Sequence, residues 1–209
     1  MNYDPWKVES VIRDTFPDKI IGYDVQVSIE PKNVHEFVEL VSINLGHFYS
    51  RNHGSNWKLD KVKEMEESGL VFVSIWDHDQ LVGFISFVDT IDDDIRVLYL
   101  YEIQINPNHQ GKSLGKLFIN YFHDLAKYLS KINNKIYSNY NNNNPHDYLD
   151  RTETLKGTKL TVFSDNSVLD WYIKLGYDKS EDSPQDRKLR SGKVIKPEYY
   201  LLFRSADNE

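Results

Sequence analysis

The feature that most constrains the fold is a change of hydrophobic period between residues 95 and 131. Residues 95–105 are rich in β-branched and aromatic side chains, which is typical of a strand, and Pro107 ends the run because proline denies the sheet a donor. The apolar residues that follow recur at helical spacing and form one stripe: Leu114, Leu117, Phe118, Tyr121, Phe122, Leu125 and Leu129. The chain therefore passes from a strand into a long helix through a short glycine-containing turn.

Further strands and helices are expected around this unit. Apolar spacing and stop signals predict helices at 4–16, 31–49, 61–68 and 167–175. Residues 50–58 are mostly polar, with Trp57 near the end of the segment, and this composition is typical of a loop. Apolar runs bounded by turn residues predict strands at 70–76, 81–89, 158–163 and 199–203, the first two as a hairpin. This order predicts an α/β fold, with a mixed central sheet flanked by helices.

Length and composition predict one globular domain. A chain of 209 residues with 40% hydrophobic residues is long enough to bury a core around one sheet. Residues 133–157 are polar and asparagine-rich, which predicts a mobile insertion without chemistry. The absence of cysteine excludes disulfides, thiolate nucleophiles and cysteine-bound zinc. The seven histidines are scattered, and no pair has zinc-binding spacing with an intervening glutamate, so no metal is expected.

Charge and hydropathy narrow the expected partners. A net charge of −7 argues against a nucleic-acid-binding surface and accommodates a basic partner more easily. No apolar run is long enough to cross a bilayer, and the first residues lack a signal-peptide pattern. We therefore expect an intracellular protein without membrane contact. Because no heptad pattern or partner helix is visible, we expect a monomer.

The turn between the strand and the long helix is the candidate ligand site. The first amides of a helix lack internal partners, and the macrodipole adds positive potential there, so an anionic pyrophosphate is stabilised. From the residues alone, a tight turn without a ligand is an equally good interpretation. The spacing of Gly111 and Gly115 is neither that of a mononucleotide P-loop nor that of the dinucleotide fingerprint.

Gln110 and Gly115 resemble the signature of the GNAT acetyltransferase superfamily, which is Gln or Arg, two residues, Gly, one residue, then Gly or Ala. Ser113 departs from the signature because it stands where its first glycine usually lies. The resemblance implies a single-domain GNAT fold with acetyl-CoA as co-substrate and no metal. The cofactor-binding residues that it implies are Ile103, Gln104, Ile105, Gln110, Gly111, Lys112, Ser113, Leu114, Gly115, Lys116 and Asn166.

Further segments narrow the resemblance to the NatD family of histone amino-terminal acetyltransferases. These segments are residues 98–104, 160–163 and 182–184, together with Tyr199. The resemblance implies transfer of acetyl to the amino-terminal serine of peptides that begin Ser-Gly-Arg-Gly, the tails of histone four and histone two-A. It also implies a location in cytoplasm and nucleus.

Three residues are candidates for catalysis. An amine must lose a proton before it attacks a thioester, and an α-amine with a pKa of about 8 needs only a modest base. Glu102 is the candidate base, acting through water, because a charge in an apolar strand is costly unless it faces a cleft. The alternative for Glu102 is an exposed strand carboxylate. Tyr172 can protonate the leaving thiolate or serve in packing, and Tyr101 can line the peptide channel.

The resemblance also places residues around the peptide. Tyr99 and Tyr101 share the strand face opposite Glu102 unless a bulge, for which GNAT enzymes are known, turns one of them over. An arginine in the peptide needs a carboxylate, and among the aspartates at 89 and 92–94 we favour Asp92. The expected substrate-binding residues are Tyr49, Trp57, Asp89, Asp92, Tyr99, Thr161 and Tyr199, and the alternative for the aromatic ones is ordinary packing.

Two alternatives to this function stay open. A GNAT enzyme that acts on another amine, such as a lysine side chain or a small molecule, would share the same strand and turn. A CoA-binding interaction module that has lost catalysis is the other, motivated by Ser113 in the pyrophosphate turn.

Overall fold

A computed structural model describes residues 5–29, 31, 34–131 and 154–207. Most of the asparagine-rich segment at 133–157 lies outside these residues. Its last residues, however, belong to the folded body, because Leu155 is buried and Gly157 begins a strand. In the part of the chain that is described, no helix has the length and hydropathy to span a membrane.

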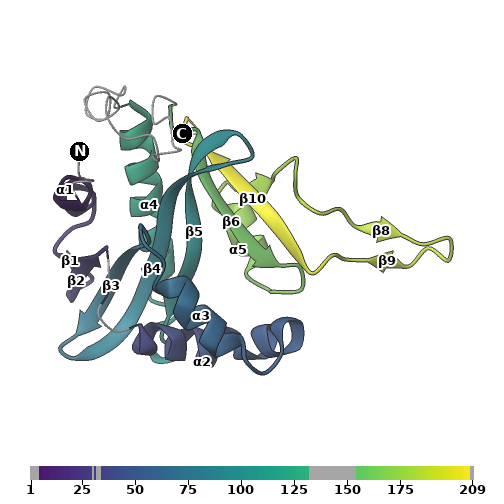
Figure 1. Ribbon diagram of the computed structural model, residues 1–209, viewed down its shortest axis with the longest axis horizontal. Helices are drawn as coiled ribbons and strands as arrows, with labels where there is room; N and C mark the ends of the chain where they lie inside the picture. The colour runs from purple at the N-terminus through teal and green to yellow at the C-terminus, as the bar shows by residue number, and fades with distance from the viewer. Residues whose placement is uncertain (1–4, 30, 32–33, 132–153, 208–209) are drawn as a thin grey trace.

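One mixed sheet of eight strands forms the centre of the molecule, in the order β1-β2-β3-β4-β5-β6-β10-β7 (Figure 1). Its strands are β1 (Lys19–Ile20), β2 (Tyr23–Ser28), β3 (Val71–Asp77), β4 (Gln80–Asp92), β5 (Ile95–Ile105), β6 (Gly157–Phe163), β7 (Asp178–Lys179) and β10 (Tyr199–Ser205). Only β5 and β6 are paired in parallel; all other neighbours are antiparallel. A separate hairpin of β8 (Arg187–Lys188) and β9 (Val194–Ile195) extends from the body before β10.

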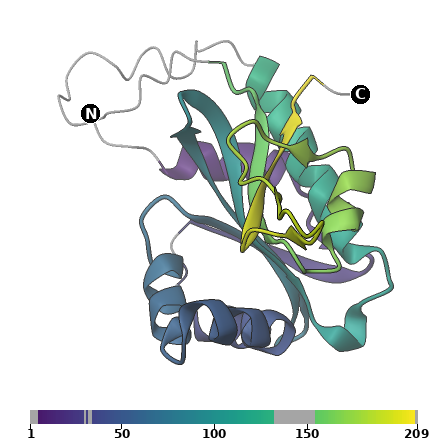
Figure 2. The same ribbon diagram turned by 90° about the vertical axis from the view of Figure 1, so that its right-hand side faces the viewer.

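Helices cover both faces of this sheet (Figure 2). The helices are α1 (Pro5–Thr15), α2 (His35–His53), α3 (Trp57–Met65), α4 (Leu114–Lys131) and α5 (Leu169–Lys174), and a short 3₁₀ turn, η1 (Pro107–His109), precedes α4. The apolar stripe of α4 packs with α1 and α5 into one core cluster, and α2 and α3 form a second cluster on the opposite face. The expected α/β class with a mixed central sheet flanked by helices is confirmed.

The prediction of a loop over 50–58 is wrong. Helix α2 continues to His53, where Gly54 ends it with a φ of 77°, and α3 begins at Trp57. The Trp57 ring stacks on that of Tyr49 at a centroid distance of 4.8 Å and is 5% exposed. This tertiary contact buries Trp57 while most of the polar residues around it stay exposed, and it outweighs a local sequence that has no helical hydrophobic pattern. The short strands β1, β2, β7, β8 and β9 were not predicted, because two to six residues carry too little periodicity.

A buried histidine lies on the inner side of α4. His123 is 5% exposed, packs against the Tyr177 ring at 5.2 Å, and its Nδ1 lies 3.4 Å from the Thr158 hydroxyl. Burial, together with the positive charges of Arg204 and Lys127, lowers the pKa of His123 to about 3. The folded protein therefore holds this imidazole neutral.

We expect His123 to make the protein less stable in weak acid. The pKa of His123 is lower in the folded protein than in the unfolded chain. Below pH 6.5 the unfolded chain therefore binds a proton that the folded protein does not bind, and the free energy of unfolding decreases as the pH decreases. The loss due to this group is about 2 kcal/mol between pH 7.5 and pH 5. Urea denaturation across this range should show a flatter dependence for His123→Phe, which keeps the ring contact. Equal slopes for the two proteins would contradict the assignment.

Candidate active site

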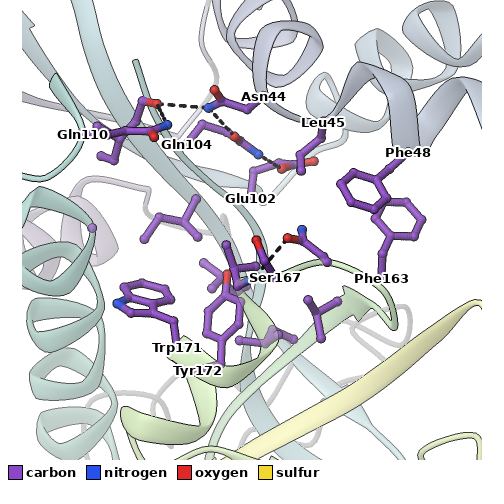
Figure 3. A pocket seen from close by; sticks show the side chains of 18 of the residues that line it. Asn44, Leu45, Phe48, Glu102, Gln104, Gln110, Phe163, Ser167, Trp171 and Tyr172 are labelled. Carbon is purple, nitrogen blue, oxygen red and sulfur yellow. Dashed lines mark hydrogen bonds between the residues drawn. The ribbon is translucent and has the colours of Figure 1, made fainter. Parts of the chain in front are cut away.

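A gap between two central strands creates the candidate site. The parallel ladder of β5 and β6 ends at the pair Leu100–Leu160, so the two strands are no longer paired beyond it. A pocket of about 1020 Å³ lies over this gap, between α2, the start of α4 and the loop that leads into α5 (Figure 3). The backbone edge of β5 after Leu100 is thus free of the neighbouring strand.

The pocket gathers most of the residues expected from the sequence. Every expected cofactor residue except Lys112 lines it, as do all three catalytic candidates. Of the substrate candidates, Tyr49 and Thr161 line it. The others lie outside the lining: Trp57, Asp89, Asp92, Tyr99 and Tyr199.

A β-bulge in β5 decides which way Glu102 points. Ser86 of β4 lies opposite Glu102 and Phe87 lies opposite Leu100, so Tyr101 is the extra residue of the bulge. The shift by one residue brings Glu102 to the face covered by α2 and α3. Glu102 therefore does not lie on the face opposite the tyrosines, as the regular alternation of a strand would have placed it.

The Glu102 carboxylate is buried and held from both sides. It is 4% exposed, and its Oε1 accepts from the Tyr49 hydroxyl at 2.8 Å and lies 2.9 Å from Lys61 Nζ. Gln104 Nε2 donates to Oε2 at 2.7 Å, and Asn44 Nδ2 in turn donates to Gln104 Oε1 at 2.9 Å (Figure 3). The expectation of an exposed strand carboxylate is thus excluded. Gln104, expected at the cofactor, uses its side chain to orient Glu102.

Tyr49 and Trp57 have different places in this arrangement. Burial and the neighbouring Glu102 carboxylate raise the pKa of Tyr49, which keeps its hydroxyl protonated as a donor. Trp57 lies behind the Tyr49 ring and donates from Nε1 to the Ser50 hydroxyl at 3.2 Å. Its burial supports the packing alternative for Trp57 over direct contact with a substrate.

The turn before α4 has the form of an anion site. Its backbone is left-handed at Gly111 and at Ser113, with φ of 75° and 63°. Helix α4 begins at Leu114, so the amides of its first turn open toward the pocket. A Cβ added at Gly115 would lie 3.6 Å from the Trp171 ring, which is an ordinary van der Waals contact, so the packing of this ring does not require a glycine. Gln110 ties the turn to β5 by donating from Nε2 to the Ile105 carbonyl at 3.0 Å.

Two expected cofactor residues have other partners. Lys112 donates to the Tyr23 hydroxyl of β2 at 3.2 Å, and this hydroxyl also pairs with His109 Nδ1 at 2.9 Å. The Asn166 side chain accepts from the backbone amide of Val168 at 3.1 Å and so caps the turn before α5. Lys116 and Leu114 line the pocket, although the Leu114 side chain itself belongs to the core.

Tyr172 lies in the wall of the pocket on α5. It is 7% exposed and contacts the Trp171 ring edge-to-face at 5.0 Å. Burial, with smaller contributions from Tyr177 and Glu102, raises the pKa of Tyr172. The hydroxyl therefore stays protonated and can donate a hydrogen bond, but it is a weak acid.

The aspartates near β4 and β5 are already paired within the chain. Asp89 accepts from two nitrogens of Arg96, at 2.9 and 2.6 Å, so both of its oxygens are occupied and it is a poor candidate for a substrate arginine. Asp92 pairs with Lys159, and the same ammonium lies 2.6 Å from Asp182 Oδ2. Asp92 keeps a 37% exposed side chain, whereas Lys159 is 2% exposed.

Several hydroxyl groups gather where β5, β6 and β10 adjoin. The hydroxyls of Tyr99 and Thr161 pair at 2.6 Å across the β5–β6 boundary, and the rings of Tyr99 and Tyr101 meet edge-to-face at 5.7 Å. Tyr199 begins β10 opposite Phe163 and is 39% exposed. Tyr99 belongs to the paired part of the β5–β6 ladder, and Thr161 is the first residue of β6 after the ladder ends.

Several functional residues were missed from the sequence. Asn44 supports both Gln104 and the Ile105 carbonyl, and Phe48 stacks on Phe163 at 5.2 Å across the pocket (Figure 3). Nothing in their local pattern indicates these contacts, which join segments far apart in sequence. The burial of Lys61 could have been inferred from the sequence, because Lys61 lies one helical turn from each of two buried residues of α3, Trp57 and Met65.

Three features define an acyltransferase-type site: the end of the β5–β6 pairing, the bulge at Tyr101, and the amino-terminal end of α4 after a glycine-containing turn. Residues 37–148 match the acetyltransferase (GNAT) family, and the chain belongs to this family. A similar relative is N-alpha-acetyltransferase 40 of Saccharomyces cerevisiae, which is 28% identical over 184 residues, covering 79% of this chain and 59% of that protein. The chain thus spans 59% of the length of this relative.

Solved structures share the fold. The ribosomal-protein-S18-alanine N-acetyltransferase of Escherichia coli is 12% identical with a TM-score of 0.50, covering 88% of this chain and 96% of that chain. The PaiA N-acetyltransferase of Thermoplasma acidophilum, solved in complex with coenzyme A, is 14% identical with a TM-score of 0.50, covering 87% and 99%. A GNAT acetyltransferase of Listeria monocytogenes is 14% identical with a TM-score of 0.51, covering 90% and 98%.

The described residues contain no group of three or more histidine, cysteine, aspartate or glutamate side chains that could hold a metal ion. The Glu102 carboxylate in the wall of the pocket is paired with Lys61 of α3.

Ser113 should carry a measurable cost in stability. Compared with glycine, a residue with a Cβ destabilises the folded state by about 1–2 kcal/mol at a left-handed φ. About half of this difference is cancelled because glycine has more conformational freedom in the unfolded chain. We expect Ser113→Gly to raise the melting temperature by about 1–3 °C in scanning calorimetry. Ser113→Ala, which keeps the Cβ, should leave it unchanged. A fall in melting temperature for the glycine variant would show that the serine side chain stabilises the turn.

Proposed function

We propose that this chain is an acetyl-CoA-dependent N-alpha-acetyltransferase, which acetylates the amino-terminal serine of peptides beginning Ser-Gly-Arg-Gly, such as the tails of histone four and histone two-A. The observation that carries the proposal is a buried, hydrogen-bonded Glu102 in the wall of a pocket that opens at the mouth of α4. The similarity to N-alpha-acetyltransferase 40 supports an α-amine as the acceptor.

The residues of the turn fit the anionic end of acetyl-CoA. The first amides of α4, from Ser113 to Lys116, offer donors and positive potential to the pyrophosphate. The edge of β5 offers the backbone groups of Ile103 and the amide of Ile105 to the pantetheine arm, because β6 has left the ladder by that point. The Ile105 carbonyl itself already accepts from Asn44 and Gln110. These two features together direct the thioester toward Glu102.

Glu102 takes the proton that the amine must lose. Tyr49 and Lys61 both occupy Oε1, while Oε2 has Gln104 as its partner and keeps a further acceptor position. The ammonium of the peptide gives a proton to this carboxylate through water, and its nitrogen then attacks the thioester carbon. The carbon–sulfur bond breaks, and the nitrogen releases its second proton as the amide forms; this proton goes to the leaving thiolate, so that coenzyme A leaves as the thiol. The Tyr172 hydroxyl, which its raised pKa keeps protonated, donates a hydrogen bond to the sulfur as it leaves.

The peptide enters from the side of the hydroxyl groups. Tyr99, Tyr101 and Thr161 surround the end of the gap between β5 and β6, and Tyr199 lies at its edge. Asp92 is the carboxylate for an arginine at the third position of the peptide, since Lys159 pairs with its Oδ2, whereas Arg96 bonds both oxygens of Asp89.

The direct test of the proposal is incubation with acetyl-CoA and a Ser-Gly-Arg-Gly peptide, followed by mass spectrometry. A peptide with a free amino terminus should gain one acetyl group, and a peptide with a blocked terminus but a free lysine should gain none. Acetylation of the blocked peptide would indicate a different amine as the acceptor. Coenzyme binding without any product would indicate a non-catalytic CoA-binding module.

Removal of the base should lower turnover without affecting coenzyme binding. For Glu102→Gln we expect kcat to fall by about 100-fold or more, because general-base catalysis contributes about 10²–10⁴-fold. The affinity for acetyl-CoA, measured by calorimetry, should stay within about twofold. Glu39→Gln, at an exposed ion pair of α2, is the matched control and should behave as the wild type. Unchanged turnover in the Glu102 variant would rule out its role as the base.

The arginine of the peptide should report on Asp92. We expect Asp92→Asn to raise the KM for Ser-Gly-Arg-Gly by about tenfold, because a hydrogen bond to a charged partner contributes about 1.5–3 kcal/mol. The KM for Ser-Gly-Gly-Gly should be the same in both proteins. Asp93→Asn in the exposed turn serves as the control. Equal KM values for the arginine peptide would assign its recognition to another residue.

A further inference from the structure

Helix α3 carries a buried lysine behind the candidate base. Lys61 is 6% exposed, and its Nζ lies 2.6 Å from Glu64 Oε1 and 2.9 Å from Glu102 Oε1. The same ammonium lies 4.7 Å from the centre of the Tyr49 ring. Lys58 and Lys63 of this helix instead make exposed ion pairs with Glu39 and Asp60. Lys61 is therefore the lysine of α3 that points into the protein.

Stability does not explain a lysine at this position. Withdrawing an ammonium from water costs several kcal/mol, and a buried ion pair is often no better than apolar packing of the same volume. Lys61 lies between Trp57 and Met65 on the buried side of α3, where an apolar residue would continue the core. What the lysine adds is a fixed positive charge beside the Glu102 carboxylate.

We propose that Lys61 is a positioning residue for acetyl transfer, which pairs with the Glu102 carboxylate through Oε1 and turns its Oε2 toward the reacting amine. This inference rests on the function proposed above. With Tyr49, Lys61 occupies Oε1, so the remaining acceptor position belongs to the oxygen bound by Gln104. Lys61 is absent from the lining of the pocket, so it acts through Glu102 without touching acetyl-CoA.

The surrounding charges make the ammonium necessary. Glu102 of β5 and Glu64 of α3 both pair with Lys61, and the Tyr49 hydroxyl of α2 donates to Glu102. Glu67 acts on Glu64 through its charge, and Glu102 acts on Tyr172 of α5 in the same way. Burial lowers the pKa of Lys61, but the negative charges of Glu102 and Glu64 outweigh it and raise the pKa overall. Without the cation, the buried Glu102 carboxylate would face the partly exposed Glu64 carboxylate, and proton uptake would relieve their repulsion.

The test compares pH profiles of kcat/KM for Ser-Gly-Arg-Gly between pH 5 and pH 9. Lys61→Met should move the acid limb to higher pH by about one unit or more, as expected for loss of a cation close to a carboxylate. At neutral pH its kcat should fall while the KM for the peptide stays nearly constant. Lys61→Arg, which keeps the charge, should restore the limb, and Lys58→Met on the same helix should leave it in place. Calorimetry should give the same acetyl-CoA affinity for all four proteins.

Two outcomes separate this inference from the proposed function. If the wild type yields no acetylated peptide, the proposed function fails and the role of Lys61 fails with it. If the wild type is active and Lys61→Met keeps the wild-type acid limb, the role of Lys61 alone is overturned. If Lys61→Met fails to fold, the double variant Lys61→Met/Glu64→Gln replaces it, because it also removes the charge that faces Lys61. The acid limb of the double variant must then lie at higher pH than that of Glu64→Gln alone. Coinciding limbs in that pair would equally overturn the inference.

Discussion

The structure depends on one buried negative charge at the centre of the sheet. Glu102 is tolerated there because Tyr49 from α2, Lys61 from α3 and Gln104 from β5 all contact its two oxygens. An unpaired carboxylate in this position would cost several kcal/mol, so the contacts fix both helices against the strand. Asn44 extends the arrangement to the end of β5, where the Ile105 carbonyl also receives Gln110 from the turn before α4.

The same backbone features place this charge at the mouth of the pocket. The bulge at Tyr101 turns Glu102 toward α2 and α3, and the ladder with β6 ends just before it. A regular β5, fully paired with β6, would have placed Glu102 on the other face and left no edge for a ligand. The proposed positions of coenzyme and peptide therefore follow from two interruptions of one strand. The left-handed residues Gly111 and Ser113 then reverse the chain so that α4 begins beside this edge.

Sequence patterns predicted the long elements and failed on the short ones. Strand β5 was predicted with its observed limits, and α4 within a residue or so, because each carries a long, clear period. The loop expected over 50–58 was wrong because the burial of Trp57 against Tyr49 holds a polar segment in two helices. For the site, the residues of the turn could be located, since strand, turn and helix are contiguous. The partner of Asp92 could not, because Lys159 lies far along the chain, and that of Asp89 depends on the register between β4 and β5, which brings Arg96 beside it.

The sequence by itself determined the class of fold, the family resemblance and the segment that forms the mouth of the pocket, because these depend on hydrophobic period and on glycine, proline and glutamine at fixed local spacing. Only the tertiary structure decided the direction of Glu102, the pairing of the aspartates and the burial of Lys61. Each of these depends on the register between strands or on side chains brought together from separate elements, and such contacts leave no local pattern in the chain.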